Sequence, residues 1–259
     1  MAHNALVQAA VSGNVAGFAF AAQGIQEQKQ RHTKLLQAVD AVVQIRTPSV
    51  SGTGFIVACQ RLGVAAPVVL TNAHVVPDDA TARRAEAVAF NDDVHQPHEH
   101  LRFRFRRLLY ASSPGSWAAG GAASPTELEG HDFAVLEIDA ADLARLQRRG
   151  VQPLRCLDDA EIARFKRSFD PTLQSVPEVL VVQHPRGGQK KISAPPPKCY
   201  KYGGDTVTTI PALRRLLRDD RHREMAIATN NQGAEASQPG SSGSPILDSV
   251  TLKVTVRLL

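Results

Sequence analysis

The sequence is poor in cysteine and has no long apolar run, and each absence excludes a class of protein. Its three cysteines, Cys59, Cys156 and Cys199, are an odd number, lie far apart and include no CxxC pair. Neither a disulfide framework nor a zinc site is therefore expected, and an intracellular, cytoplasmic location fits best. Polar residues interrupt the N-terminal stretch ALVQAAVSGNVAGFAFAA before it reaches the roughly 18 to 20 apolar residues that cross a bilayer. No lysine or arginine precedes that stretch, unlike in a secretory signal, and no membrane partner is expected.

The chain is basic, with a formal net charge of +5, which is a balance also found in proteins that bind nucleic acid. Its arginines are scattered, however. In LRFRFRR, residues 101–107, they alternate with apolar residues, and this period predicts a strand with one solvated and one buried face. The arginines are thus explained as the outer face of a strand, and no nucleic-acid partner is expected.

Most of the chain has the pattern of short strands, and 43% of its residues are hydrophobic, enough for one or two packed units. Helices are expected in the N-terminal extension, residues 1–38, and in residues 141–150 and 159–168, which would connect two halves of the protein. The first three predicted strands would form a meander. The predicted strands are residues 41–45, 53–58, 67–73, 100–110, 132–138, 178–184, 224–230 and 252–258.

Three polar residues stand where a chemical site is expected. His74 ends an apolar strand in VVLTNAHVV, Asp132 precedes the apolar run FAVLEI, and Ser242 lies in PGSSGSP, where Gly240 and Gly243 permit a sharp bend. Each alone has an ordinary structural explanation. A serine nucleophile, however, needs a histidine to accept its proton and a third group to orient the imidazole, so the three together suggest a catalytic triad.

The order His, Asp, Ser along the chain is that of the chymotrypsin-type proteases. From residue 41 onward the sequence resembles the trypsin-like, or chymotrypsin-fold, serine proteases through SGTGFIV, TNAHVV, HDFAVLEI and PGSSGSP. The stretch VVQHPRGGQKKIS, residues 181–193, and the missing cysteine pairs make it similar to disulfide-free intracellular and bacterial members rather than to secreted digestive enzymes.

This resemblance implies an all-β fold of two six-stranded β-barrels. The protease domain would occupy residues 39–259, with the first barrel at about 39–140 and the second at about 170–259. His74 and Asp132 would come from the first barrel and Ser242 from the second. The expected activity is that of a serine endopeptidase that acts on polypeptides through an acyl-enzyme, without a metal or organic cofactor. The N–H groups of Gly240 and Ser242 would bind the oxyanion, and Ala236 would form the uncharged base of the specificity pocket.

The sequence departs from the family pattern in two places. Ser241 stands where trypsin-like zymogens carry an aspartate, so a site assembled directly by folding is expected. Only a short tail follows Ser242, so the second barrel would be truncated, with an open edge that a partner chain could fill. The alternative to an endopeptidase is therefore a catalytically inactive pseudoprotease that acts as a protein-binding module.

HQPHEH, residues 95–100, offers one further candidate site. If it formed a strand, His98 and His100 would share a face near His95 and could bind a metal. A polar loop between barrel strands is the preferred interpretation.

Overall fold

The computed structural model describes ten stretches of the chain. They are residues 30–58, 64–92, 95–112, 132–158, 160–161, 164, 179–193, 198–200, 226–228 and 239–254.

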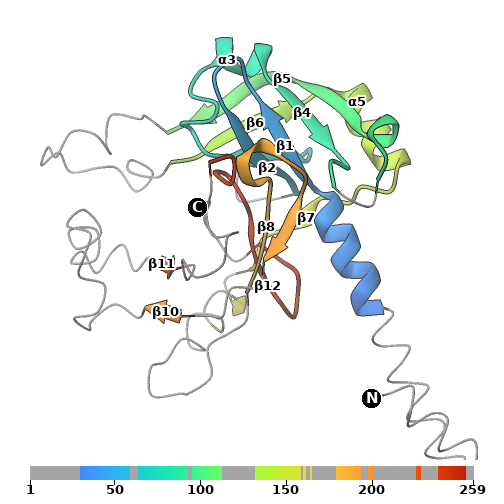
Figure 1. Ribbon diagram of the computed structural model, residues 1–259, viewed down its shortest axis with the longest axis vertical. Helices are drawn as coiled ribbons and strands as arrows, with labels where there is room; N and C mark the ends of the chain where they lie inside the picture. Colours follow the sequence, from blue (N-terminus) through green and yellow to red (C-terminus); the bar gives the residue numbers. More distant parts are fainter. Residues whose placement is uncertain are drawn as a thin grey trace, which may run out of the picture.

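Six antiparallel strands form a closed β-barrel, at the top of Figure 1. Their order around the barrel is β1-β4-β5-β6-β3-β2, and pairing of β1 with β2 closes it. The consecutive pairs β1–β2 and β2–β3 form the predicted meander. The six strands are β1 (Val42–Arg46), β2 (Ser51–Ala58), β3 (Val68–Thr71), β4 (Glu86–Ala89), β5 (Leu101–Ala111) and β6 (Ala134–Ile138). The all-β class and the six-stranded first barrel are therefore confirmed.

Strand β5 shows how the sequence pattern produces the barrel wall. Leu101, Phe103 and Phe105 are buried, whereas the arginines between them are exposed, as the alternation predicts. On the outer face Arg102 pairs with Glu86 of β4, and Arg106 pairs with Glu137 of β6. Arg107 also pairs with Glu137, so three arginines of β5 have carboxylate partners on neighbouring strands.

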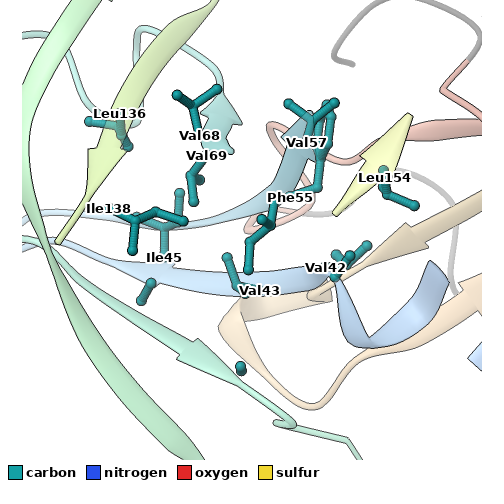
Figure 2. Packing of buried hydrophobic residues seen from close by; sticks show 14 of the residues in the cluster. Val42, Val43, Ile45, Phe55, Val57, Val68, Val69, Leu136, Ile138 and Leu154 are labelled. Atoms are coloured by element: carbon teal, nitrogen blue, oxygen red, sulfur yellow. The ribbon is translucent and has the colours of Figure 1, made fainter. Parts of the chain in front are cut away.

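Buried β-branched and large apolar side chains pack together on the strands of the barrel and around them (Figure 2). Each of these side chains contributes roughly 1.5 to 3 kcal/mol when removed from water. Together they form the apolar core around which the strands that carry the candidate site are arranged. The labelled side chains are Val42, Val43, Ile45, Phe55, Val57, Val68, Val69, Leu136, Ile138 and Leu154.

Two strands of this sheet were not predicted. Strand β4, with the sequence EAVA, contains alanine and glutamate, which are depleted in strands, and it is held by pairing with β1 and β5 on either side. Strand β7 (Leu154–Arg155) has only two residues and pairs in parallel with β2. Both depend on partners distant in the sequence, so local preference alone does not reveal them.

In the described part of the chain, helices precede β1, connect β3 to β4 and follow β6. Residues 30–40 are helical and run directly into β1, in agreement with the predicted helical extension. Helix α3 (Asp79–Arg84) begins at the N-cap Asp78, and α5 (Ala140–Arg148) begins at the N-cap Asp139. Helix α5 confirms the helix predicted at residues 141–150. None of the helices in the described residues is long and apolar enough to span a membrane.

The C-terminal half contributes a three-stranded sheet in the order β12-β8-β9 and a two-stranded sheet of β10 and β11. The strands are β8 (Val179–Gln183), β9 (Lys191–Ser193), β10 (Lys198–Tyr200), β11 (Ala226–Ala228) and β12 (Ile246–Asp248). Of the predicted strand at residues 252–258, only residues 252–254 are described, and Val254 makes isolated bridges to Leu247 and Cys156. A complete second barrel, its truncation, its partner chain and the domain boundaries remain predictions.

Replacing Leu136 on β6 with alanine tests the contribution of the barrel core. Leu136 is fully buried, so the change removes buried surface and leaves a cavity; we expect a loss of about 2 to 5 kcal/mol in the free energy of unfolding. Urea denaturation would show a lower midpoint with an unchanged m-value. The matched control is Val250→Ala, at a residue that is 80% exposed, where a change within about 0.5 kcal/mol is expected. Equal losses in the two variants would contradict this picture of the core.

Candidate active site

His74 lies at the rim of the barrel, just beyond the end of β3. The amides of Val75 and Val76 both donate to the carbonyl oxygen of Asn72, at 3.1 and 3.2 Å, so the chain turns as it leaves the strand. Val75 and Val76 are buried, whereas the His74 side chain is 51% exposed. The two valines therefore anchor the turn and present the imidazole to the outside.

Asp132 is brought to His74 by the pairing of β3 with β6. The two strands are antiparallel with Thr71 opposite Ala134, so the residues that follow β3 meet those that precede β6. His74 Nδ1 shares a short hydrogen bond with Asp132 Oδ2, and the His74 amide donates to Oδ1 at 3.0 Å. Asn72 Nδ2 also donates to Oδ2, at 3.0 Å. The carboxylate thus holds the imidazole with bonds to both its ring and its backbone.

These contacts shift the protonation of both groups. Partial burial would raise the pKa of Asp132, but the hydrogen bonds from the His74 ring, Asn72 and the His74 amide outweigh it and lower the pKa to about 2. The hydrogen bond to Asp132 raises the pKa of His74 above its ordinary value, against a smaller opposing effect of burial. Because Asp132 stays ionised, it favours the tautomer of neutral His74 that carries its proton on Nδ1, which leaves Nε2 as the basic atom.

Residues 239–244, here called the nucleophile loop, need glycine at two positions. Gly240 and Gly243 have φ angles of +93° and +88°, a region that side chains disfavour. A Cβ on Gly240 would overlap the backbone of Gly187, and one on Gly243 would overlap the carbonyl oxygen of Thr53. The loop therefore lies directly against its neighbours at both glycines, as the sequence predicted for a sharp bend.

Thr53 of β2 fixes the nucleophile loop to the first barrel. Its amide donates to the carbonyl oxygen of Ser242 at 2.8 Å, and its Oγ1 donates to that of Gly240 at 2.8 Å. Thr53 Oγ1 also accepts a hydrogen bond from the His184 amide at 2.9 Å, and Thr71 Oγ1 donates to Thr53 O at 2.7 Å. Thr53 is fully buried, so these bonds are shielded from water.

The carbonyl groups on the rear of the loop determine where two of its amides point. The Arg186 amide donates to Pro239 O at 2.5 Å, and Ser244 donates to Ser241 O from both its amide and its hydroxyl. A trans peptide directs its N–H opposite its C=O, and the described residues contain no cis peptide. The N–H groups of Gly240 and Ser242 therefore point away from these partners. Within the described part of the chain neither amide donates a hydrogen bond, so both are available to an anionic oxygen.

The three serines of the loop differ in exposure. Ser241 and Ser244 are buried, and Ser244 Oγ is occupied by its bond to Ser241 O. Ser242 is half-buried. The hydroxyl of Ser241 has no hydrogen-bond partner in the described part of the chain. Among these serines, Ser242 is the most accessible to a substrate.

The two parts of the candidate site meet at Gly52. A Cβ on Gly52 would lie 2.6 Å from Val75 Cγ1 and 3.3 Å from Ser242 O, so the backbone of Ser242 adjoins the residue that follows His74. Among the hydrogen bonds of the described residues, none joins Ser242 to His74. Ala236, the predicted base of the specificity pocket, lies outside the described residues.

Two residues of the site were not identified from the sequence. Asn72 positions Asp132, and Thr53 holds the nucleophile loop. Both are polar, buried and lie in or directly after an apolar strand, which is the one local signal that could have revealed them. Their partners are far away in the sequence, so their roles depend on the fold.

The histidines of HQPHEH are arranged for structure. Residues Pro97–Glu99 form a short 3-10 helix, so the strand required by the metal alternative is absent there. His95 instead bonds Asp92 Oδ1 through its amide and Nδ1, each at 2.9 Å. No group of three or more metal-binding side chains is found among the residues that the structure describes.

Several solved protease structures are similar to the chain. The Rv3671c protease in an inactive form has 18% sequence identity and a TM-score of 0.44, over 85% of this chain and 77% of that one. The same protein from M. tuberculosis H37Rv, as a Ser343Ala mutant in an inactive form, has 16% identity and a TM-score of 0.43, over 85% and 74%. Deg5 also has 16% identity and a TM-score of 0.43, over 86% and 81% of the two chains.

A search of curated proteins finds none that matches the chain. The family described as "Trypsin-like peptidase domain" matches residues 52–254, which include β2, the His74–Asp132 pair and the nucleophile loop. The match covers well over half of the chain and agrees with the family that the four sequence motifs predicted. The chain therefore belongs to the family of trypsin-like peptidase domains.

Proposed function

We propose that this protein is a serine endopeptidase that uses His74, Asp132 and Ser242 as its catalytic triad. The observation that carries the proposal is the His74–Asp132 pair, in which an ionised carboxylate bonds both the ring and the amide of a half-exposed histidine. A histidine held only for structure has no need of an exposed Nε2. Family membership supports a peptidase activity, and a polypeptide is the corresponding substrate.

In the proposed reaction Ser242 Oγ attacks the carbonyl carbon of the scissile peptide as His74 Nε2 accepts the hydroxyl proton. Asp132 stabilises the resulting imidazolium through its bond to Nδ1. The oxyanion binds the N–H groups of Gly240 and Ser242, whose directions are fixed by Arg186 and Ser244 behind the loop. His74 then returns the proton to the leaving amine. Water, activated in turn by His74, hydrolyses the acyl-enzyme and releases the second product.

The electrostatics of the site suit this mechanism. The base must be neutral in the resting enzyme and cationic in the transition state, and Asp132 stabilises the cation without becoming protonated. The raised pKa of His74 increases its strength as a base. The residues proposed here require no metal or organic cofactor. The intracellular location stays a prediction that rests on cysteine usage.

Labelling with a fluorophosphonate probe tests the nucleophile. We expect the wild-type protein to gain one phosphonyl group, with the modified peptide containing Ser242, and Ser242→Ala to remain unlabelled. Ser249→Ala is the matched control, because this buried serine lies after β12 and outside the nucleophile loop, and it should be labelled normally. Intact mass followed by peptide mapping provides the measurement. A folded wild-type protein that stays unlabelled would favour a binding-only pseudoprotease, and labelling of another serine would show that the triad is assigned wrongly.

The pH dependence of labelling tests the base. The rate should rise with pH as His74 loses its proton, with an apparent pKa above 6.5 because Asp132 stabilises the protonated form. In Asp132→Asn the rise of the labelling rate with pH should occur at lower pH. The maximal rate should fall by as much as about 10⁴-fold, because the imidazole loses its orienting carboxylate. The same apparent pKa for labelling in both proteins would contradict the assignment of Asp132.

Thr53→Val tests the support of the nucleophile loop. The change keeps the side-chain shape but leaves the buried Gly240 carbonyl and His184 amide without their Oγ1 partner. We expect the labelling rate constant at saturation to fall about 10-fold or more, and the free energy of unfolding to fall by about 1 to 3 kcal/mol. Thr47→Val, in the exposed turn between β1 and β2, is the control and should change the labelling rate little. An unchanged rate in Thr53→Val would show that the loop does not depend on this hydroxyl.

A further inference from the structure

Lys190 is a buried lysine to which the proposed reaction assigns no role. Its side chain is only 1% exposed, and Nζ donates to the carbonyl oxygen of Val39 at 2.8 Å. Nζ also lies 3.9 Å from Asp92 Oδ2. Removing an ammonium group from water is costly, so a lysine at this depth indicates that its position is tightly determined by its partners.

The groups around Lys190 come from two other elements. Val39 and Asp40 lie at the end of the helix over residues 30–40, and Asp92 follows β4. Burial raises the pKa of Asp40, and Lys190 opposes that rise. Burial would also raise the pKa of Asp92, but its hydrogen bonds from His95 outweigh burial and lower it. Lys190 therefore joins its own segment to the helix end and to the β4–β5 connection.

Residues 184–190 are fastened to the first barrel along their length. The Lys190 amide donates to Asn91 O at 2.7 Å, and Gln44 Nε2 donates to Gly187 O through a short hydrogen bond. Asn91 Nδ2 donates to Gln44 Oε1 at 2.8 Å and thereby fixes the glutamine amide. The segment is thus held by β1, by the residues after β4 and by the buried ammonium.

The opposite side of the same segment contacts the nucleophile loop. The Arg186 amide donates to Pro239 O, the carbonyl of the peptide whose N–H belongs to Gly240. The backbone of Gly187 lies where a Cβ on Gly240 would be placed. A displacement of residues 184–190 would therefore change the direction of the Gly240 N–H.

We propose that Lys190 is a positioning residue that holds residues 184–190 against the first barrel and thereby fixes the Gly240 N–H for the oxyanion. This inference rests on the proposed function and deepens it. Lys190 acts through the backbone of the segment, remote from the reacting atoms. The Lys190 ammonium is attracted by Asp92 and Asp40. Through these contacts it links residues 184–190 to the end of the helix over residues 30–40 and to the β4–β5 connection.

The protonation of Lys190 gives this role a measurable signature. Burial lowers its pKa from 10.5 to about 8, although Asp92 and Asp40 oppose the effect. The other charged or titratable groups nearby are His95 on Asp92, Arg46 on Gln44, and His184, whose pKa burial lowers to about 3, so that it is neutral. A displaced segment would expose Lys190 and restore its ordinary pKa, so the docked segment binds fewer protons than a displaced one, and a rise in pH above 8 should favour the docked segment.

The free energy of unfolding should change in the same direction. Because the pKa of Lys190 is lower in the folded protein than in the unfolded chain, the unfolded chain binds more protons between pH 8 and 10.5. The contribution of Lys190 to the free energy of unfolding therefore rises with pH across this interval. A loss of labelling activity above pH 8 would therefore not arise from Lys190, through either unfolding or displacement of residues 184–190.

The test compares Lys190→Met with Lys253→Met. Lys253 pairs with Glu161 at 2.5 Å, away from residues 184–190, so its variant also loses a lysine ion pair but should keep wild-type kinetics. With a fluorophosphonate probe, we expect Lys190→Met at pH 7 to lose about 10-fold or more in the maximal labelling rate constant, with little change in the probe concentration at half-maximal rate. The ratio of wild-type to Lys190→Met rate constants should then persist as pH rises above 8, because deprotonation of Lys190 does not favour the displaced segment. Both rate constants depend in the same way on the protonation of His74, so this dependence cancels in their ratio.

Each outcome decides the inference. Equal rate constants for folded wild-type and Lys190→Met proteins at pH 7, or a ratio that falls to one between pH 8 and 9.5, would overturn it while the proposed function stands. If Lys190→Met does not fold, Asp92→Asn replaces it, with a smaller loss in the same direction expected. If the wild-type protein is not labelled at all, the proposed function is wrong. Hydrogen exchange of residues 239–244 then decides the inference, with faster exchange in Lys190→Met than in Lys253→Met supporting it and equal exchange contradicting it.

Discussion

The hydrogen bonds of Thr53 to the nucleophile loop are the contacts on which the rest of the candidate site depends. One buried residue of β2 bonds the carbonyl groups of Gly240 and Ser242, on either side of Ser241. The imidazole and its carboxylate are positioned by the pairing of β3 with β6, which belong to the same barrel as β2. One closed sheet therefore holds both parts of the site.

Much of the fold follows from local sequence pattern, and the exceptions have a common cause. Strand β5 is predictable because its apolar residues alternate with arginines, a pattern that indicates which face is buried. Strand β4 is not, because EAVA has weak strand preference and is extended only because β1 and β5 pair with it. His74 and Asp132 are predictable from motifs next to strands. Lys190 is not, since a lysine in GGQKK has the pattern of a surface residue until the tertiary fold places it against Val39 and Asp92.

The polar residues of the site form two groups with different physical tasks. Asp132 and His74 form a partly exposed pair, where water can reorient as the charge on the imidazole changes, and the buried Asn72 donates a hydrogen bond to Asp132. Thr53, Gln44, Asn91 and Lys190 are buried, and their hydrogen bonds act on backbone groups or on one another. In a region of low dielectric constant such bonds are stronger and an unpaired partner is costly, so they favour a single arrangement of the backbone.

The position of Ser241 explains why this second group matters. A carboxylate there, as in zymogens of the family, would let a distant ammonium order the loop only after cleavage. The hydroxyl of Ser241 is buried without a hydrogen-bond partner in the described part of the chain, so it supplies no such control. The ammonium to which we assign a role in ordering the loop belongs instead to Lys190, which bonds Val39 O and acts through the backbone of residues 184–190. Under the proposed function, the order of the oxyanion site is therefore a consequence of folding itself, and it requires no activating cut.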